Sequence, residues 1–439
     1  MLLKFKKELI LFVASLILLF CSYQFGIFSV INGPWGGFER FQHSSDSLVF
    51  GKITQSRNEG IFSYQGRLGR LHFPSGRVNE NTSQKLILNQ KLSGGNYQPY
   101  NSNFGLQGVF YSLVDKALTK LNIDFKSRVF IFHAITSFLL AVVLALIILL
   151  FYLELGMPPA IFLLFALAFE QWLVLIGKSL YWSFWFFYIP FLITFIFHKF
   201  DEQNKNINFN YFYLSIFITV FFKSLFGYEF VSTVIIAALT PIVYFSIKNQ
   251  WKKIQTIKRM LITGIYGVFG FLTAFIAHIV QLYFSAGSFS ESLSIILYRA
   301  IARTHGEPHD SKNIHFVDSL SSSVFSVYKI YLKGMLGETT VLMVVFIFAT
   351  IISYTRLKVM KKNFNSLKAL TITLWFSFLA PMSWYTLAKG HSFDHNHLNH
   401  VLWNLPFNIF GFTLVGLVFY LLVQELLNKL RFHSKRRLI

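Results

Sequence analysis

The segment from Lys389 to His400, KGHSFDHNHLNH, places four histidines, one lysine and one aspartate within 12 residues. Apolar runs of about 20 residues flank it on both sides, and a run of that length can cross a bilayer. We therefore predict that the segment lies at a membrane surface. Imidazole groups there could donate hydrogen bonds to phosphate or to sugar hydroxyls. Its candidate substrate-binding residues are Lys389, His391, Asp394, His395 and His397.

A second ionisable stretch, RTHGEPHD at residues 303–310, has five ionisable side chains in eight positions. Its candidate binding residues are His305 and His309. A divalent cation such as Mg or Mn could be held here, but the spacing matches no established zinc pattern such as HExxH. The three candidate histidines of the first segment alternate in a way that is typical of an extended chain. We therefore favour hydrogen bonding over metal binding and assign no metal ligand.

The stretch FERFQHSSDSLVFGKI, residues 38–53, contains the candidate catalytic residue. Asp46 is the only acidic residue between Glu39 and Glu59. A carboxylate close to a membrane exit can act as a general base that activates a hydroxyl for attack. The alternative is a helix N-cap, because SSDS is well suited to capping. We predict a base at Asp46 and a substrate-binding role for His43 beside it.

Basic residues of the same polar region could bind phosphate. Arg67 and Arg70 lie in YQGRLGRLHF, and guanidinium groups match phosphate oxygens. The alternative is an ordinary solvated basic loop.

Two short turns between apolar runs, GKSLYWSFW and FKSLFGYEF, each present a lysine, a serine and aromatic residues. Lys178 and Tyr181 of the first turn are candidate binding residues, as are Lys223 and Glu229 of the second. Tyr and Trp are also expected at a membrane interface for structural reasons. Because Lys223 and Glu229 are six residues apart, a structural ion pair between them is the favoured interpretation.

The composition predicts the class of protein that holds these residues. Of the 439 residues, 54% are hydrophobic and 13% charged, and the mean hydropathy is +0.52. These values indicate an all-α polytopic membrane protein. The net charge of +21 lies largely in short segments between apolar runs, where positive-inside topology explains it without a nucleic-acid partner. The single Cys21 excludes an intrachain disulfide and a cysteine-based zinc site.

Apolar runs divide the chain into about ten predicted spans within one membrane domain, residues 1–439. The spans are 9–31, 129–153, 158–177, 181–197, 210–226, 230–247, 260–284, 338–354, 369–388 and 401–423. Ten spans place every strongly basic short loop on one side, so we expect both termini in the cytoplasm. The predicted outer loops are 32–128, 285–336 and 389–400. We expect an interfacial helix within 104–126.

The polar residues are concentrated on the predicted outer face. Nine of the 13 histidines lie in the outer segments, and ionisable groups within spans lie toward the outer ends. Burying such groups against lipid is costly, so a cavity open to that face explains the bias. No Walker A and no GxGxxG motif is present. An energy-rich donor would therefore arrive already attached to lipid.

This arrangement resembles the GT-C superfamily of integral membrane glycosyltransferases, which use polyprenyl-phosphate sugars. A first span followed by a long outer loop with an aspartate near its start, an interfacial helix before the second span, and a long loop between spans 7 and 8 carry the resemblance. Family members often have a paired acidic motif where this chain has His43 and Asp46 alone, which favours a metal-independent reaction.

The resemblance implies an inverting transfer in which Asp46 deprotonates the acceptor hydroxyl and polyprenyl phosphate leaves. Arg and Lys side chains of the first loop and residues 389–400 would hold the leaving charge. The implied location is the bacterial cytoplasmic membrane, and the acceptor would be a glycan, a lipid or a protein. Three alternatives remain: a transporter or flippase of lipid-linked sugars, an O-antigen polymerase or ligase, and a non-catalytic membrane scaffold.

Overall fold

The computed structural model describes residues 2–29, 38–72, 85, 88–89, 95–203, 207–306, 314–334, 337–357 and 364–436. Most of these residues are helical, and a two-stranded sheet is the only sheet within them. Seven described helices are long and apolar enough to cross a membrane, which confirms a multi-pass helical membrane protein. They are α1 (Leu2–Phe25), α5 (Phe125–Leu155), α9 (Phe209–Phe226), α10 (Val231–Lys248), α11 (Lys253–Ala286), α15 (Glu338–Leu357) and α19 (Phe407–Arg436).

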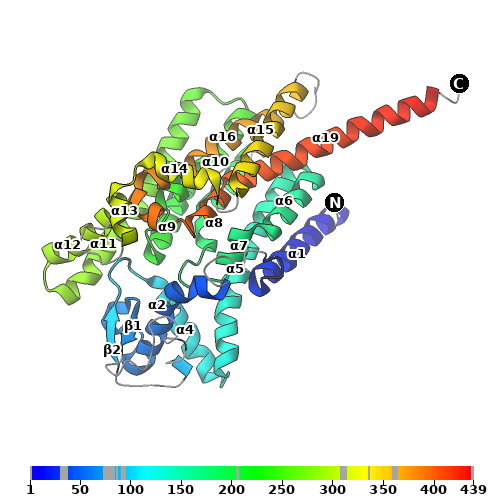
Figure 1. Ribbon diagram of the computed structural model, residues 1–439. Coiled ribbons are helices and arrows are strands. Elements are labelled where there is room, and N and C mark those ends of the chain that lie inside the picture. Colours follow the sequence, from blue (N-terminus) through cyan, green and yellow to red (C-terminus); the bar gives the residue numbers. More distant parts are fainter. Residues whose placement is uncertain are drawn as a thin grey trace.

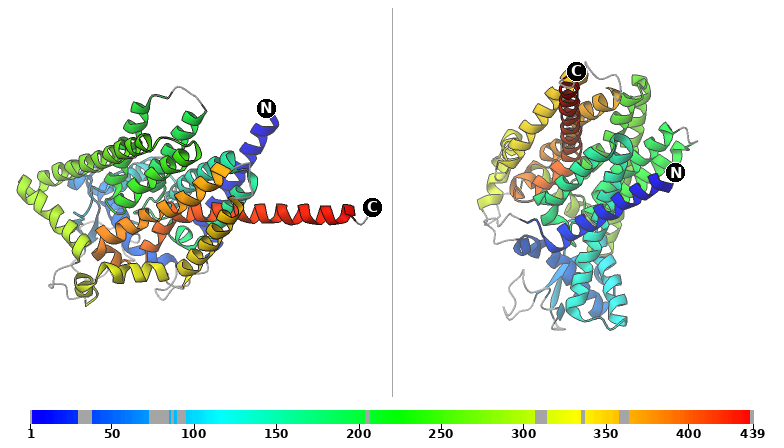
Figure 2. Two further views of the ribbon diagram at one scale, coloured as in Figure 1. Left: turned by 90° about the horizontal axis from the view of Figure 1, so that it is seen from above. Right: turned by 90° about the vertical axis from the view of Figure 1, so that its right-hand side faces the viewer.

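The long helices pack side by side into one bundle. α5 contacts α1 and α8 (Trp185–Glu202), α9 contacts α11, and α19 contacts α6 (Met157–Phe169). Both ends of the chain lie away from the small sheet (Figure 1), and α19 extends beyond its neighbours (Figure 2). The orientation of the two termini relative to a membrane stays a prediction.

Three of the ten predicted spans are not formed by single apolar helices of spanning length. The predicted span 158–177 is divided between α6 and α7 (Gln171–Ile176). The break falls at Glu170, whose carboxylate accepts the Leu173 N–H at 2.9 Å and caps α7. The span 369–388 is divided between α16 (Phe364–Ser377) and α17 (Leu379–Leu387).

The third is the span 181–197. Its helix α8 starts at Trp185 and carries three charged residues close to its end, Lys199, Asp201 and Glu202. The full count of ten spans therefore stays a prediction.

Two predicted span boundaries are wrong. α1 ends at Phe25 rather than at residue 31. α19 begins at Phe407 rather than at residue 401, and a 3₁₀ helix, η2 (Asn399–Asn404), precedes it. Pro406 explains the delay, because the residue before a proline is pushed out of the helical region. Leu405 is accordingly extended, with φ −125° and ψ 92°.

A small subdomain with the only described sheet lies between α1 and α5. It consists of α2 (Phe38–Glu59), η1 (Ser63–Gly66), β1 (Gly69–His72), β2 (Asn96–Pro99) and α4 (Leu106–Lys120). β1 and β2 are antiparallel, with Gly69 opposite Pro99. The strands are a correction to the all-α prediction, whereas α4 falls within the predicted interfacial helix. We call this unit the sheet subdomain.

The predicted outer loop 285–336 is also folded into helices where it is described. These are α12 (Phe289–His305), α13 (Ile314–Ser321) and α14 (Val324–Lys333). α12 buries Ile296 but leaves Phe289 and Ile301 more than half exposed, at 59% and 57%. A helix with such an exposed apolar face is suited to lying along a membrane interface. The predicted loop 389–400 contains α18 (Lys389–Asp394), which packs against α12.

Candidate functional site

Five segments that are far apart in the sequence meet around one cavity of about 420 Å³, which we call the polar cavity. The sheet subdomain and the segment after it contribute Ser45, Leu48, Arg70, Tyr100 and Ser102. The two short turns contribute Tyr181, Trp182 and Glu229. α12 contributes Arg299, Ala302 and Arg303, and the histidine segment contributes His391, Asp394, His395, His397 and Leu398.

Seven of the sequence-predicted site residues therefore lie together. They are Arg70, Tyr181, Glu229, His391, Asp394, His395 and His397. The sequence analysis missed the two arginines of α12, Arg299 and Arg303. The signal that could have found them is their spacing of four residues, which places both on one face of a helix.

An ion pair between α12 and the second turn forms one wall of the cavity. Arg303 Nη2 donates to Glu229 Oε1 at 2.7 Å, and Tyr181 Oη donates to the same oxygen at 3.4 Å. Arg303 Nη1 also donates to the Ser102 carbonyl at 3.3 Å. Although burial opposes the charge, Glu229 raises the pKa of Arg303. Arg303 is therefore a fixed, permanently charged group.

The predicted ion pair between Lys223 and Glu229 is not formed. Lys223 Nζ instead donates to the carbonyl oxygens of Gly227 and Glu229, and it lies 4.5 Å from the centroid of the Phe187 ring. The carbonyls at the end of α9 lack helical partners, and a lysine there satisfies them. Lys223 thus closes the turn and leaves the Glu229 carboxylate to Arg303.

Asp46 lies in the middle of α2, so the N-cap alternative is wrong. Its Oδ1 accepts hydrogen bonds from Ser179 Oγ at 2.9 Å and from the Tyr181 N–H at 3.1 Å. Burial raises the pKa of Asp46 to about 7, against the opposing effect of these two donors. The carboxyl group is not among the described groups that line the polar cavity. Ser45 and Leu48 of the same helix do line it.

Arg67 and Arg70 have different environments. Arg70 lines the cavity, and its Nε donates to Ser47 Oγ at 2.7 Å. Arg67 is 4% exposed and donates to Asn101 Oδ1 and Gln65 Oε1, at 2.8 and 3.0 Å. Burial lowers the pKa of Arg67. Arg67 therefore ties local loops together outside the cavity lining, so the solvated-loop alternative is wrong, while its binding role stays a prediction.

Other predicted binding residues lie away from the cavity lining. Lys389 donates to the carbonyls of Leu320 and Ser322, at 3.0 and 2.8 Å, and so caps the end of α13. His305 contacts Thr304, and Lys178 also lies outside the lining. His309 and the side chain of His43 lie outside the described residues.

Three histidines form a row along the cavity wall. The ring centroids of His391 and His395 are 4.3 Å apart with nearly parallel planes, and those of His395 and His397 are 5.8 Å apart. His391 and His395 are four residues apart at the α18 helix, so the extended chain predicted from their spacing is wrong. Asn399 Nδ2 lies 3.1 Å from His391 Nδ1 and fixes that ring.

The histidine row is uncharged near neutral pH. Burial lowers the pKa of His391 well below its ordinary value and that of His395 to about 4, and repulsion between the imidazoles adds to both. Burial also lowers the pKa of His397. The row therefore offers hydrogen bonds without charge.

A close backbone contact joins the histidine row to the arginines. A Cβ atom at Gly390 would lie 2.5 Å from the Gly306 nitrogen and 2.7 Å from the Ala302 carbonyl oxygen. Only glycine permits this approach of α18 to the end of α12.

A second cavity, of about 200 Å³, opens beside the polar cavity and shares three of its residues: Ser102, Arg299 and Arg303. The other lining residues are mainly apolar and come from α10, α11, α12 and α17 and their ends. They include Tyr228, Val231, Phe271, Phe275, Ile296, Trp384 and Leu387. We call this cavity the apolar groove.

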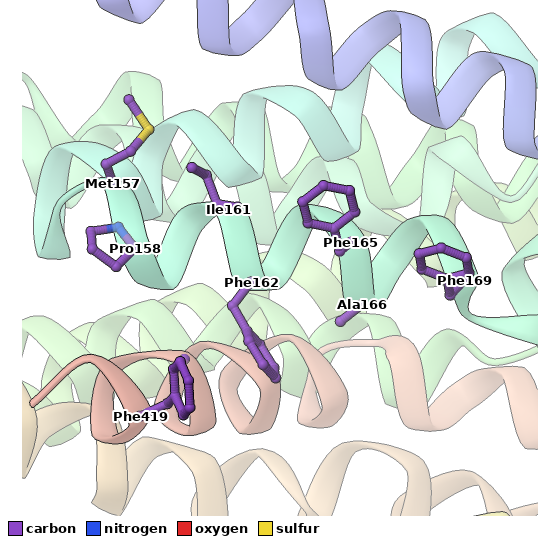
Figure 3. A pocket seen from close by; sticks show the side chains of 9 residues that line it. Met157, Pro158, Ile161, Phe162, Phe165, Ala166, Phe169 and Phe419 are labelled. Carbon is purple, nitrogen blue, oxygen red and sulfur yellow. The ribbon is translucent and has the colours of Figure 1, made fainter. Parts of the chain in front are cut away.

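A larger cavity between α6 and α19, of about 510 Å³, has a different character. Side chains such as Phe162, Phe165 and Phe419 line it (Figure 3). Its whole lining is apolar, so it offers no group for chemistry and suits lipid chains.

Among the described residues, no group of three or more His, Cys, Asp or Glu side chains converges as a metal site would require. We derive no step through a metal ion. Comparisons of the chain with protein-family models, with curated proteins and with solved structures give no match. The fold and the cavities define a multi-pass helical membrane protein whose basic polar cavity adjoins an apolar groove.

Proposed function

We propose that this protein is a membrane glycosyltransferase that moves a sugar from a polyprenyl-phosphate carrier to an acceptor in the polar cavity. The observation that carries the proposal is the sharing of Arg299 and Arg303 between the polar cavity and the apolar groove. A ligand that fills both needs an anionic head and a long apolar tail. Polyprenyl-phosphate sugars have this form.

The charges of the polar cavity favour a phosphate ligand. Three guanidinium groups line it, and Glu229 and Asp394 are its only carboxylates among the described lining residues. Guanidinium groups match phosphate oxygens in geometry and keep their charge. As the bond to the sugar breaks, negative charge grows on the leaving phosphate. Fixed positive groups in a partly dry cavity stabilise that charge.

Other residues that line the polar cavity suit the sugar and the acceptor. Uncharged imidazoles of the histidine row can exchange hydrogen bonds with hydroxyl groups, and Tyr181 and Trp182 offer ring faces for a sugar to pack on. The phosphate and the hydroxyl groups would therefore bind to different lining residues. The acceptor would be a hydroxyl-bearing glycan, lipid or protein.

We assign the general base to Asp46, whose pKa of about 7 suits proton transfer at neutral pH. The acceptor oxygen would attack the anomeric carbon and give its proton to the Asp46 carboxylate, which would first turn from Ser179 toward the cavity that Ser45 and Leu48 of the same helix line. The bond between that carbon and the phosphate oxygen would break, and its electron pair would stay on the phosphate. Attack from the opposite side inverts the anomeric centre. Asp394, which lines the cavity, is the competing base.

The test uses the full chain in liposomes with polyprenyl-phosphate glucose, mannose, galactose or arabinose and an extract of membrane glycans as acceptor. We expect transfer of one sugar by the wild type and a loss of about tenfold or more in Arg299→Gln. The matched control is Lys429→Gln, which removes a cation that is 69% exposed and far from both cavities in the sequence. It should transfer sugar as the wild type does.

Two outcomes would overturn the proposal. One is carrier binding without transfer from any of the four carriers, accompanied by movement of the carrier across the bilayer, which would indicate a transporter. The other is equal transfer by Arg299→Gln and the wild type.

A further inference from the structure

A second polar cavity lies in the sheet subdomain and shares no lining residue with the first. It has a volume of about 850 Å³ and is enclosed by α2, α4 and the first turn of α5. We call it the basic pocket. α4 and the start of α5 lie at the end of the molecule away from both termini (Figure 1). The residues on which its chemistry depends are Arg57, Asp115, Lys116, Thr119, Lys120 and Arg128.

Positive charge in the basic pocket exceeds what its own carboxylate can balance. Asp115, which is 2% exposed, is the only acidic residue among the described lining. Arg57 binds it through two hydrogen bonds of 2.7 Å, and Arg128 Nη1 approaches it at 3.3 Å. One carboxylate therefore serves two guanidinium groups. Lys116 and Lys120, both exposed, add two further charges at the rim.

The side chain of Arg128 retains a donor that no described residue accepts. Arg128 is 9% exposed, and its Nε has no hydrogen-bond partner in the described part of the chain. A buried guanidinium that shares its counter-ion is costly unless another acceptor completes its bonds. An anionic ligand in the pocket would add a second counter-ion for this guanidinium group.

Arg128 lies four residues after Asp124, whose carboxylate attracts its guanidinium group. Positive residues are favoured at helix C-termini, which accounts for Arg57 and Lys120 in the last turns of α2 and α4. Arg128 lies instead in the first turn of α5, where the helix dipole favours negative charge. Asp124 meets that preference, because it caps α5 by accepting the Ser127 N–H at 3.1 Å.

The remaining lining combines hydrogen-bonding and apolar groups. Asn58, Thr119 and Asn122 offer polar side chains, and the half-buried Ile61 and Ile123 offer apolar surface. A saccharide has hydroxyl groups at its edge and apolar ring faces, so it uses both kinds of surface. We propose that the basic pocket binds an anionic saccharide, one that carries carboxylate or phosphate groups. This proposal goes beyond the proposed function, and binding can be measured without any sugar transfer.

The experiment measures binding of a fluorescent hexagalacturonate, an oligosaccharide of uronic acids, to the full chain in phosphatidylcholine nanodiscs. Uncharged maltohexaose serves as the reference sugar. In Lys116→Ala/Lys120→Ala, which leaves the Asp115 network intact, we expect about tenfold weaker binding of the uronate and a weaker dependence on salt. The matched control is Lys252→Ala/Lys253→Ala, two exposed lysines at the start of α11. It should bind as the wild type does.

A second variant, Arg128→Gln, tests the unpartnered donor while Arg57 continues to hold Asp115. It should also weaken binding of the uronate, and its thermal unfolding shows whether the fold is kept. The proposal would be overturned if Lys116→Ala/Lys120→Ala bound the uronate as tightly as the wild type does. It would also be overturned if the wild type bound maltohexaose as tightly as it binds the uronate. If inorganic phosphate displaced the fluorescent uronate as efficiently as unlabelled hexagalacturonate does, the pocket would be a general anion site, and the saccharide part of the proposal would be overturned. None of these outcomes bears on sugar transfer in the polar cavity.

Discussion

Two groups of charged side chains in this protein differ in how their charges are balanced. At the end of the bundle that carries the termini, Glu154 and Glu202 alternate with Lys199 and Lys248, and each lysine contacts both carboxylates. This closed cluster joins α5, α8 and α10 and balances itself. In the polar cavity, Glu229 forms an ion pair with Arg303, and Arg70 and Arg299 line the same cavity.

The difference separates a structural cluster from a binding site. A buried ion pair contributes to stability only when its geometry is good and its hydrogen bonds are complete. The closed cluster meets that condition with two acids and two bases. The polar cavity instead has three arginines and two carboxylates among its described lining residues, next to uncharged histidines and an apolar groove, and this lining suits a ligand with a negatively charged head. Variants in the two regions should therefore affect different measurements.

The largest expected effect is on sugar transfer in Asp46→Asn, at about 10²- to 10⁴-fold for a lost general base. In the wild type the rate should rise with pH through about 7, because the carboxylate accepts a proton only when ionised. The asparagine variant should lack this rise. Full activity would remove Asp46 as the base, and a matching loss in Asp394→Asn alone would transfer the role to Asp394.

Folding stability gives a second measurement for Asp46. Its folded pKa lies above its unfolded value, so its contribution is most favourable at low pH and is lost as the pH rises through about 7. Asp46→Asn cannot ionise. The difference in melting temperature between the variant and the wild type should therefore change between pH 5 and pH 8.

The next largest effect is expected for Arg303→Gln, which removes a fixed charge beside the leaving phosphate and leaves the Glu229 carboxylate buried. We expect a loss of about 10²- to 10³-fold in transfer, with lower stability. The double variant Arg303→Gln/Glu229→Gln should regain stability and remain inactive. Recovery of activity in the double variant would contradict a role for Arg303 in binding phosphate.

A variant in the closed cluster tests whether that region contributes to stability alone. Glu154→Gln leaves Lys199 and Lys248 with Glu202 as their only carboxylate and should reduce stability by about 2–4 kcal/mol. Thermal unfolding in detergent measures this loss. Carrier binding by the folded fraction should stay at the wild-type level. A change in carrier affinity would show that the two regions are coupled through α5.

The smallest effect is expected for His395→Gln, which replaces one uncharged hydrogen-bonding group by another. We expect KM to rise by about tenfold at most, because a single neutral hydrogen bond is involved. Since the pKa of His395 is lowered to about 4, its imidazole is uncharged throughout a profile of transfer rate against pH measured between pH 5.5 and 8. The shape of that profile should be the same in the variant. A change of shape would show that the histidine is charged in the working range.

Hydropathy and charge predicted the general arrangement because both act over whole segments. Seven predicted spans correspond to single helices of spanning length, two of them with wrong boundaries, and seven predicted site residues meet in one cavity. Partner choice could not be predicted in this way. Nothing in the sequence shows that Arg67 donates its hydrogen bonds to Asn101 and Gln65, or that Lys223 closes a turn. Such choices depend on side-chain directions that only the packed structure defines.

Local breaks in regular structure were also hidden from the sequence. The divided helix at Glu170 reads as one apolar run of 20 residues, because a single capping carboxylate hardly changes the hydropathy. The two strands of four residues are too short to show an alternating pattern against the surrounding polar region. Both features are fixed by contacts with distant segments.

The approach of α18 to α12 at Gly390 couples the two walls of the polar cavity mechanically. The two backbones are in direct contact there, and no side chain between them can change its rotamer to make room. α18, which carries the imidazoles, therefore cannot shift unless α12, which carries the arginines, shifts with it. A single methyl group at residue 390 would act as a wedge. It would widen the cavity as a whole and leave every functional side chain chemically intact.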